Sequence, residues 1–231
     1  MSKDVYEPST SLSHNINSKI IHKKRLSRNY AFIKRSMDIV FAILGLIITS
    51  PIFLILGTLY FLGEARGPLF YKQRRFGKGG KLFFVYKFRS MVVNADETLK
   101  RNQFLYKKYI ENNYKLEQDE DPRITKLGRF LRKTSIDELP QLINVLIGDM
   151  SLVGPRPIVE EELMEYKERK NVFLSVKPGI TGYWQVNGRS TIGYPERVNV
   201  ELYYVYHQSL KLDIYILLKT IYVVIQKKGA Y

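Results

Sequence analysis

Two adjacent carboxylates, Asp137 and Glu138, are the residues of this chain best suited to chemistry. They open an apolar segment within "TSIDELPQLINVLIGDMSLVGPRP" (Thr134–Pro157). A carboxylate held ionised at a helix N-terminus can attack phosphorus, provided that a cation offsets the negative charge of its target. Mg²⁺ bound by an adjacent acid and by phosphate oxygens would supply that charge. The pair is therefore a candidate site for nucleophilic chemistry on a phosphate.

A structural role explains the same two residues. Ser135 precedes Glu138 by three positions, which is the spacing of a capping box. Acidic side chains near a helix N-terminus are also favoured by the helix dipole. Taken without its surroundings, this local pattern favours a helix cap over a catalytic pair.

Basic residues elsewhere in the chain supply the surroundings that a phosphate site needs. They are Lys87 and Arg89 in "KFRSM", Arg123 in "DPRIT" and Arg156 in "GPRP". Arg156 lies between two prolines, so its backbone is stiff and its guanidinium can be aimed. Arginine forks match phosphate oxygens in bidentate geometry, although each arginine taken alone is more often a surface residue. We predict that these four side chains bind phosphate or substrate.

An uncharged run from Ile39 to Leu62 bears on where such a site lies in the cell; its centre is Ser50-Pro51. As one straight helix it would be about 36 Å long, enough for a hydrocarbon core of about 30 Å. Proline removes a backbone donor and clashes with the preceding turn, so the helix must kink or break there. Ser50 can satisfy a carbonyl freed at the break, and each half is then about as long as one leaflet is deep.

The flanks of this run favour a re-entrant segment that enters the membrane and turns back. A spanning helix normally carries an excess of Lys and Arg on its cytoplasmic side only. Here both flanks are basic, and their charges are Lys19, Lys23, Lys24, Arg25, Arg28, Lys34 and Arg35 before the run and Arg66, Lys72, Arg74, Arg75, Lys78 and Lys81 after it. The alternative is a spanning helix with a proline kink.

Composition narrows the class of protein. The 231 residues are enough for one domain with a real core, and the mean hydropathy of -0.20 argues against a polytopic membrane protein. The absence of cysteine excludes disulfides and thiolate zinc sites, and three histidines argue against an imidazole zinc enzyme. A net charge of +15 favours an anionic partner, which includes nucleic acid, an anionic membrane surface and phosphorylated substrates, although a solvated basic surface is the alternative.

The remaining segments predict an α+β fold that is mostly helical. Residues 1–30 are polar and lack periodicity, so we predict a mobile tail, followed by the membrane segment at 31–62 and a catalytic domain at 63–231. Two aromatic stretches around Gly77-Lys78-Gly79-Gly80 predict a β-hairpin. Helices are expected over Asp96–Lys115, Ile124–Lys133 and Ile136–Ile147, and amphipathic helices against a core or a membrane interface over Glu196–Lys228.

Long motifs over the chain from about Lys34 onward resemble the bacterial sugar transferases, the small monotopic phosphoglycosyl transferases that prime glycan assembly on polyprenyl phosphate. The matching stretches are "KRSMDIVFAILGLIITSPIF", "GPLFYKQRRFGKGGKLFFVYKFRSM", "DPRITKLGRFLRKTSIDELPQLINVLIGDMSLVGPRP", "KPGITGYWQVNGR" and "LDIYILLKT". Their combined length makes the resemblance specific, whereas an isolated Asp-Glu pair would carry no information.

The resemblance implies a mechanism and a location. Ser50-Pro51 would mark the break of a re-entrant helix in the inner membrane of a bacterium, with the catalytic domain on the cytoplasmic face. Asp137 would be the nucleophile that attacks the β-phosphate of a UDP-sugar and releases UMP, and Glu138 its partner at Mg²⁺. Polyprenyl phosphate would then take the phosphosugar from the aspartate. Arg156 would help hold the nucleotide, with Lys87 and Arg89 nearby.

Some points stay open at the level of sequence. The sugar and the glycan pathway are not encoded in any motif, and a homodimer is compatible with the chain. Glu201 stands where relatives commonly have Asp, so it is not included among the predicted site residues. Two other functions compete with the transferase: a non-catalytic membrane scaffold, in which Asp137-Glu138 is only a cap, and a membrane-tethered nucleic-acid-binding protein. The basic residues are spread over many elements, so we predict no nucleic-acid partner.

Overall fold

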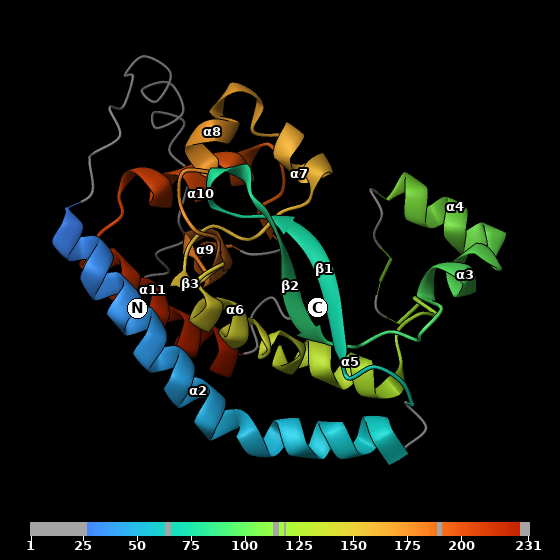
Figure 1. The fold of residues 1–231 in the computed structure, drawn as a ribbon. Helices are drawn as coiled ribbons and strands as arrows, with labels where there is room; N and C mark the ends of the chain where they lie inside the picture. The colour runs from blue at the N-terminus through green and yellow to red at the C-terminus, as the bar shows by residue number, and fades with distance from the viewer. Residues whose placement is uncertain (1–26, 63–65, 113–115, 118, 189–190, 227–231) are drawn as a thin grey trace, which may run out of the picture.

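The computed structural model describes residues 27–62, 66–112, 116–117, 119–188 and 191–226. Figure 1 shows one long helix, α2 (Arg28–Leu62), running along one side of a body built from short helices and two small sheets. The fold is thus α+β and mostly helical, as the sequence predicts. Most of the predicted tail lies outside the described residues, and its last residues already belong to α2.

Helix α2 continues through Pro51 and bends near its middle (Figure 1). Proline has no N–H to donate to the carbonyl of Ile47, four residues before it. The Ser50 hydroxyl donates to that same oxygen at 2.8 Å. The freed carbonyl therefore has a partner, and the predicted break takes the form of a bend in one continuous helix.

Both arms of α2 pack on the same body. In the first arm, the Arg35 guanidinium donates to the backbone oxygen of Val145 at 2.6 Å. In the second arm, Leu56 and Tyr60 are buried in a cluster with Phe88. A straight spanning helix would carry one end about 30 Å from a domain that lies at its other end. Here the body lies alongside α2 over most of its length.

The outer face of α2 is exposed and apolar. Among the described helices, α2 alone is long and apolar enough to cross a membrane, and only 11% of its most apolar window is buried. The exposed apolar side chains of this face include Val40, Phe41, Ile43, Leu44, Ile47, Ile48, Leu54, Ile55, Leu59, Phe61 and Leu62. An exposed apolar surface of this extent marks an interaction site.

The predicted hairpin is confirmed. Strands β1 (Phe70–Phe76) and β2 (Leu82–Phe88) pair antiparallel, with Tyr71 opposite Lys87 and Arg75 opposite Phe83. The turn between them, at Lys78–Gly80, contains two glycines with positive φ, Gly79 at 72° and Gly80 at 78°. Glycine adopts this backbone region without steric cost.

Three predicted helices differ in detail from the structure. The segment from Asp96 forms two helices, α3 (Ala95–Lys100) and α4 (Gln103–Glu111), because the Asn102 side chain caps the second one; Lys115 lies outside the described residues. The basic helix is α5 (Lys126–Lys133). The segment from Ile136 is split at Pro140 into a 3-10 turn, η2 (Ile136–Glu138), and α6 (Gln141–Ile147).

The second half of the chain builds the rest of the core around a short parallel sheet. Strand β3 (Ser151–Val153) pairs with β4 (Gly179–Thr181). Helices surround this sheet, and they are α7 (Glu160–Met164), η3 (Lys167–Arg169), α8 (Lys170–Phe173), α9 (Tyr183–Asn187), α10 (Glu196–Tyr206) and α11 (Leu210–Ile225). The predicted C-terminal helical region is therefore two helices, with Ser209 capping the second; Lys228 lies outside the described residues.

Helix α11 lies beside the first arm of α2. Asp213, buried near the start of α11, forms an ion pair with Lys34 at 3.0 Å and accepts a hydrogen bond from the Tyr30 hydroxyl at 2.9 Å. Further along α11 the apolar side chains Leu218 and Ile221 are exposed. Helix α11 therefore carries exposed apolar side chains of its own.

Candidate active site

The acidic pair lies in the 3-10 turn that joins α5 to α6. Ser135 turns the chain with a left-handed backbone (φ 56°), which is uncommon for a residue with a side chain and is found at functional turns. Its side chain makes no capping hydrogen bond. The predicted cap by the Ser135 side chain is therefore wrong: Ser135 occupies the position before the 3-10 turn, but its hydroxyl accepts no hydrogen bond from the backbone of that turn.

Asp137 is buried and has an electrostatic environment that suits a nucleophile. Its exposed fraction is 7%, and burial raises its pKa from 3.8 to about 6. Lys87 lowers that pKa, Glu138 raises it, and the Arg132 and Arg156 guanidiniums lower it. Among the described residues, no hydrogen bond or ion pair engages the Asp137 carboxylate. It is thus ionised near neutral pH, and its oxygens are not occupied by a protein partner.

Glu138 connects the turn to two basic residues from other parts of the fold. Its Oε1 atom lies 2.7 Å from Lys87 Nζ on β2 and 3.8 Å from Arg156 Nη1 in the loop after β3. The structure therefore brings three of the predicted site residues into contact, namely Lys87, Glu138 and Arg156. All three are close enough to Asp137 to shift its pKa. Asn144 of α6 fixes this geometry, because its buried side chain accepts from Tyr86 N at 3.0 Å and donates to Phe84 O at 2.7 Å.

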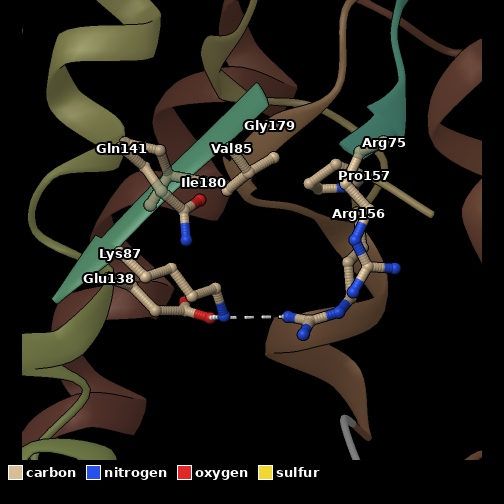
Figure 2. A pocket seen from close by; sticks show the side chains of 9 residues that line it. All are labelled: Arg75, Val85, Lys87, Glu138, Gln141, Arg156, Pro157, Gly179 and Ile180. Carbon is tan, nitrogen blue, oxygen red and sulfur yellow. Dashed lines mark hydrogen bonds and ion pairs between the residues drawn. The ribbon is translucent and has the colours of Figure 1, made fainter. Parts of the chain in front are cut away.

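Lys87, Glu138 and Arg156 line a pocket (Figure 2), and Asp137 is not among its lining residues. Lys87, Glu138 and Gln141 form one wall, and Arg156, Pro157 and Arg75 face them from the other side, as Figure 2 shows. The lining residues are Arg75, Val85, Lys87, Glu138, Gln141, Arg156, Pro157, Gly179 and Ile180. Three cations and one acid converge here, so the pocket is suited to an anionic ligand.

The arginine wall depends on a close crossing of two glycine-rich loops. A Cβ on Gly179 would lie 2.1 Å from Gly154 N, and one on Gly182 would lie 2.1 Å from Gly154 O. No side chain fits at these contacts, so the loops that carry Arg156 and Ile180 meet backbone to backbone. The contact between these loops follows from the parallel pairing of β3 with β4.

Glu201, which the sequence analysis left out, lies directly behind this wall. It is fully buried and accepts a hydrogen bond from the Arg156 backbone N–H at 3.4 Å. It also accepts from the Tyr166 hydroxyl and pairs with Arg197 at 3.3 Å. Glu201 therefore positions the Arg156 loop from within the core. The signal available in the sequence was that Glu201 keeps a carboxylate at a position where relatives commonly have Asp.

Two predicted phosphate ligands, Arg89 and Arg123, lie among other partners. The Arg89 side chain is buried and donates to the backbone oxygen of Pro68 at 2.8 Å, which holds the segment between α2 and the hairpin. Arg123 forms a bidentate ion pair with Asp121, in which Nε and Nη2 each donate to a carboxylate oxygen at 2.8 Å, and its guanidinium lies over the Tyr109 ring. These contacts account for both side chains by structural roles, and their predicted role at a phosphate stays a prediction.

Arg132 of α5 lies close to the site, although the sequence analysis did not select it. Its Nε donates to Ser90 Oγ at 2.8 Å, and its charge lowers the pKa of Asp137. This contact is possible because Gly128 brings α5 against the backbone of Ser90, where a Cβ would lie 1.8 Å from Ser90 O. The sequence offered no signal that linked Gly128 to the site.

The acidic pair fits a Mg²⁺ ion that is shared with a substrate. In the described part of the chain, no cluster of three acidic or histidine side chains offers a complete metal cage. Mg²⁺ is commonly bound by only one or two carboxylates together with substrate phosphates and water. Asp137, which is buried and has no described hydrogen-bond or ion-pair partner, together with the adjacent Glu138, matches that mode of binding.

The fold and the pocket define an α+β protein with a carboxylate pair opposite arginines, an arrangement that suits phosphate esters. Residues 29–227 match the family described as bacterial sugar transferase, and the chain belongs to this family.

Curated relatives carry names that concern undecaprenyl-phosphate sugar phosphotransfer or exopolysaccharide production. The chain is 48% identical over 222 residues to an undecaprenyl-phosphate galactose phosphotransferase of Salmonella typhimurium, covering 95% of this chain and 46% of the relative. It is 43% identical over 202 residues to the exopolysaccharide production protein ExoY of Sinorhizobium fredii, covering 86% of this chain and 88% of the relative. It is 39% identical over 208 residues to a UDP-N-acetylgalactosamine-undecaprenyl-phosphate N-acetylgalactosaminephosphotransferase of Aeromonas hydrophila, covering 87% and 45%. The chain thus spans less than half the length of two of these three relatives.

Proposed function

We propose that this chain transfers a sugar 1-phosphate from a UDP-sugar to a polyprenyl phosphate, the undecaprenyl carrier, as a first membrane step of exopolysaccharide, capsule or glycoconjugate synthesis. The products are a polyprenyl-diphosphate sugar and UMP. The observation that carries the proposal is the buried Asp137 carboxylate, ionised near neutral pH and beside a pocket of cations. The names of the relatives, which mention UDP-sugars and undecaprenyl phosphate, support the same substrates.

In the proposed first half-reaction, an Asp137 oxygen attacks the β-phosphorus of the UDP-sugar. The bond from that phosphorus to the bridging oxygen breaks, and UMP leaves with the electron pair. Asp137 then carries the phosphosugar as an acyl phosphate. In the second half-reaction an oxygen of the polyprenyl phosphate attacks the same phosphorus and releases the aspartate.

The surrounding residues have separate tasks in this scheme. Lys87 keeps Asp137 ionised, because its charge lowers the pKa of that carboxyl group. Arg156 lies on the pocket wall, where its guanidinium can hold phosphate oxygens. Asp137 and Glu138 would hold Mg²⁺ together with substrate phosphate oxygens, and the ion would offset the negative charge at the reacting phosphorus.

We further propose that α2 enters the cytoplasmic leaflet and turns back at Ser50-Pro51. Three observations support this topology: the bend at Pro51, the basic flanks on both sides, and the contacts of both arms with one body. The exposed apolar faces of α2 and α11 would then lie against lipid, and the pocket would be open to soluble UDP-sugars at the bacterial inner membrane.

The test of the reaction is UMP release by the detergent-solubilised protein. Mg²⁺, polyprenyl phosphate and a panel of UDP-sugars are supplied, with Asp137→Asn as the matched inactive variant. We expect release with one sugar or a small set, and none from the variant. Turnover retained in Asp137→Asn would contradict the covalent route, and no release with any UDP-sugar from folded protein would contradict the reaction itself.

A further inference from the structure

Arg75 faces the pocket from β1, although neither its sequence context nor the family motifs marked it as a site residue. Its side chain is only 14% exposed. Successive residues of a strand point to opposite faces, so the neighbouring Arg74 lies on the other side of the hairpin, over the Phe84 ring. The two adjacent arginines therefore have different environments, and only Arg75 lines the pocket.

The Arg75 guanidinium is held in a fixed orientation. Its Nη1 atom lies 3.1 Å from Glu162 Oε2, and its Nη2 donates to Gln73 Oε1 at 2.9 Å. These bonds use two of the five N–H donors of the group, which leaves donors for a ligand. An arginine fixed in this way binds an oxyanion with little loss of side-chain entropy.

The same network reaches Arg156. Glu162 also pairs with Arg197 at 3.1 Å, and Arg197 pairs with Glu201 at 3.3 Å. Glu201 in turn accepts the Arg156 backbone N–H at 3.4 Å. A chain of ion pairs, completed by this backbone hydrogen bond, thus connects the Arg75 guanidinium to the backbone of Arg156; both arginines face Lys87 and Glu138 across the pocket (Figure 2).

The charges of this network favour an anion between the two arginines. Burial and the neighbouring charge of Arg156 lower the pKa of Arg75, which indicates electrostatic repulsion between the two cations. Glu162 is shared between Arg75 and Arg197, and Glu138 already has Lys87 as its nearer partner. A phosphate monoester carries close to two negative charges at neutral pH and would balance both guanidiniums.

We propose that Arg75 and Arg156 form the subsite for the nucleotide phosphate, the one that leaves as UMP. The inference rests on the proposed function. The opposite wall, with Lys87, Glu138 and the nearby Asp137, receives the phosphate that carries the sugar. Glu162 is a positioning residue that acts through Arg75.

The test measures nucleotide binding without turnover. UMP and uridine are titrated calorimetrically against the Asp137→Asn protein with Mg²⁺, alone and combined with Arg75→Gln, Arg75→Lys or Arg74→Gln. We expect Arg75→Gln to weaken UMP binding about tenfold or more and to leave uridine binding unchanged. Arg75→Lys keeps the charge but loses the fork, so an intermediate loss is expected. Arg74→Gln, the matched control on the opposite face, is expected to bind UMP like its parent.

Folding is controlled by the thermal midpoint of each variant and by the uridine affinity. Glu162→Gln gives a second route to the same answer, because it releases Arg75 without removing it and is expected to weaken UMP more than uridine. UMP affinity that is unchanged in folded Arg75→Gln, or reduced equally in Arg74→Gln, would overturn this inference alone. An absence of UMP binding by the Asp137→Asn parent would overturn the proposed nucleotide donor and this subsite together.

Discussion

The Nζ atom of Lys87 lies 2.7 Å from Oε1 of Glu138, and this contact joins the β-hairpin to the turn that carries Asp137. The lysine therefore has two effects. It partly neutralises Glu138, which would otherwise raise the pKa of Asp137, and its own charge lowers that pKa directly. A single cation thus offsets part of the cost of burying the nucleophile's charge.

Replacing Lys87 by Met is expected to slow UMP release about a hundredfold at pH 7. Without the cation the pKa of Asp137 rises, so the rise of the rate with pH should move to higher pH. Lys87→Arg keeps the charge and should retain more activity. Lys72→Met, on the opposite face of the hairpin, is the control. A pH profile of Lys87→Met that coincides with the parent profile would contradict this role.

The raised pKa of Asp137 predicts that this buried aspartate destabilises the folded protein at pH values above its pKa. A group whose pKa is higher in the folded state than in the unfolded state stabilises the fold at low pH, and this stabilisation is lost as pH rises through the folded pKa. The relevant window lies between 3.8 and about 6. Asp137→Asn removes the ionisation, so in EDTA it should be more stable than the parent at pH 8, by up to about 3 kcal/mol.

Thermal unfolding of both proteins in EDTA from pH 4 to pH 8 is the measurement. The difference between them should be smallest at pH 4, grow as pH rises from about 4 to about 6, and level off above that. A difference that is the same at every pH would show that the buried carboxylate does not titrate in this window.

The sequence predicted the parts of the fold that depend on local pattern. The glycine turn at Lys78–Gly80 fixed the hairpin, and the apolar run with Ser50-Pro51 fixed both α2 and the carbonyl that the serine satisfies. Helix boundaries that depend on a cap or on proline were less well predicted, because Asn102 and Pro140 act only once the neighbouring segments are in place.

The site was predicted in part for a similar reason. Lys87, Glu138 and Arg156 were selected from their motifs, and the structure brings them together. Arg75 and Glu201 were not selected, because their places at the pocket depend on contacts with residues far away in the sequence, such as Glu162 and Arg156. The alternation of β1 decides which of Arg74 and Arg75 faces the pocket, and this depends on the packing of the hairpin against the body.

The hydrogen bonds of Asn144 join α6 to β2, the strand that carries Lys87, so we expect its replacement to affect the stability of the fold around the site. Its fully buried side chain makes two hydrogen bonds to the backbone of β2, at Tyr86 N and Phe84 O. Asn144→Ala leaves both backbone groups without this partner, so the free energy of unfolding should fall by about 2–4 kcal/mol. Asn144→Asp, which keeps an acceptor but not a donor, should also destabilise. Denaturant unfolding is the measurement, and a loss below about 0.5 kcal/mol in Asn144→Ala would contradict the assignment.

Gly128 predicts a second such link, and the chain provides its control. A Cβ at Gly128 would lie 1.8 Å from Ser90 O, whereas one at Gly57 in α2 meets nothing within 4 Å. Gly128→Ala should push α5 away from Ser90 and displace Arg132, with loss of UMP release and a lower thermal midpoint. Gly57→Ala should be neutral or stabilising by about 1 kcal/mol, because alanine favours helix. Equal behaviour of the two variants would refute the close approach of α5.

The re-entrant topology predicts that both ends of α2 lie on the cytoplasmic side. The chain contains no cysteine, so single cysteines can be introduced at Asn29 in the first turn of the helix and at Lys72 after its end, both exposed positions. A membrane-impermeant maleimide should label neither position in intact cells with a permeabilised outer membrane, and both positions in inverted inner-membrane vesicles. A spanning helix would place one of the two cysteines on the periplasmic side, where intact cells would be labelled at that position alone. Labelling of either cysteine from the periplasmic side would therefore exclude the re-entrant topology of α2. It would also place one end of α2 across the bilayer, which the contacts of Arg35 and Tyr60 with the same body oppose.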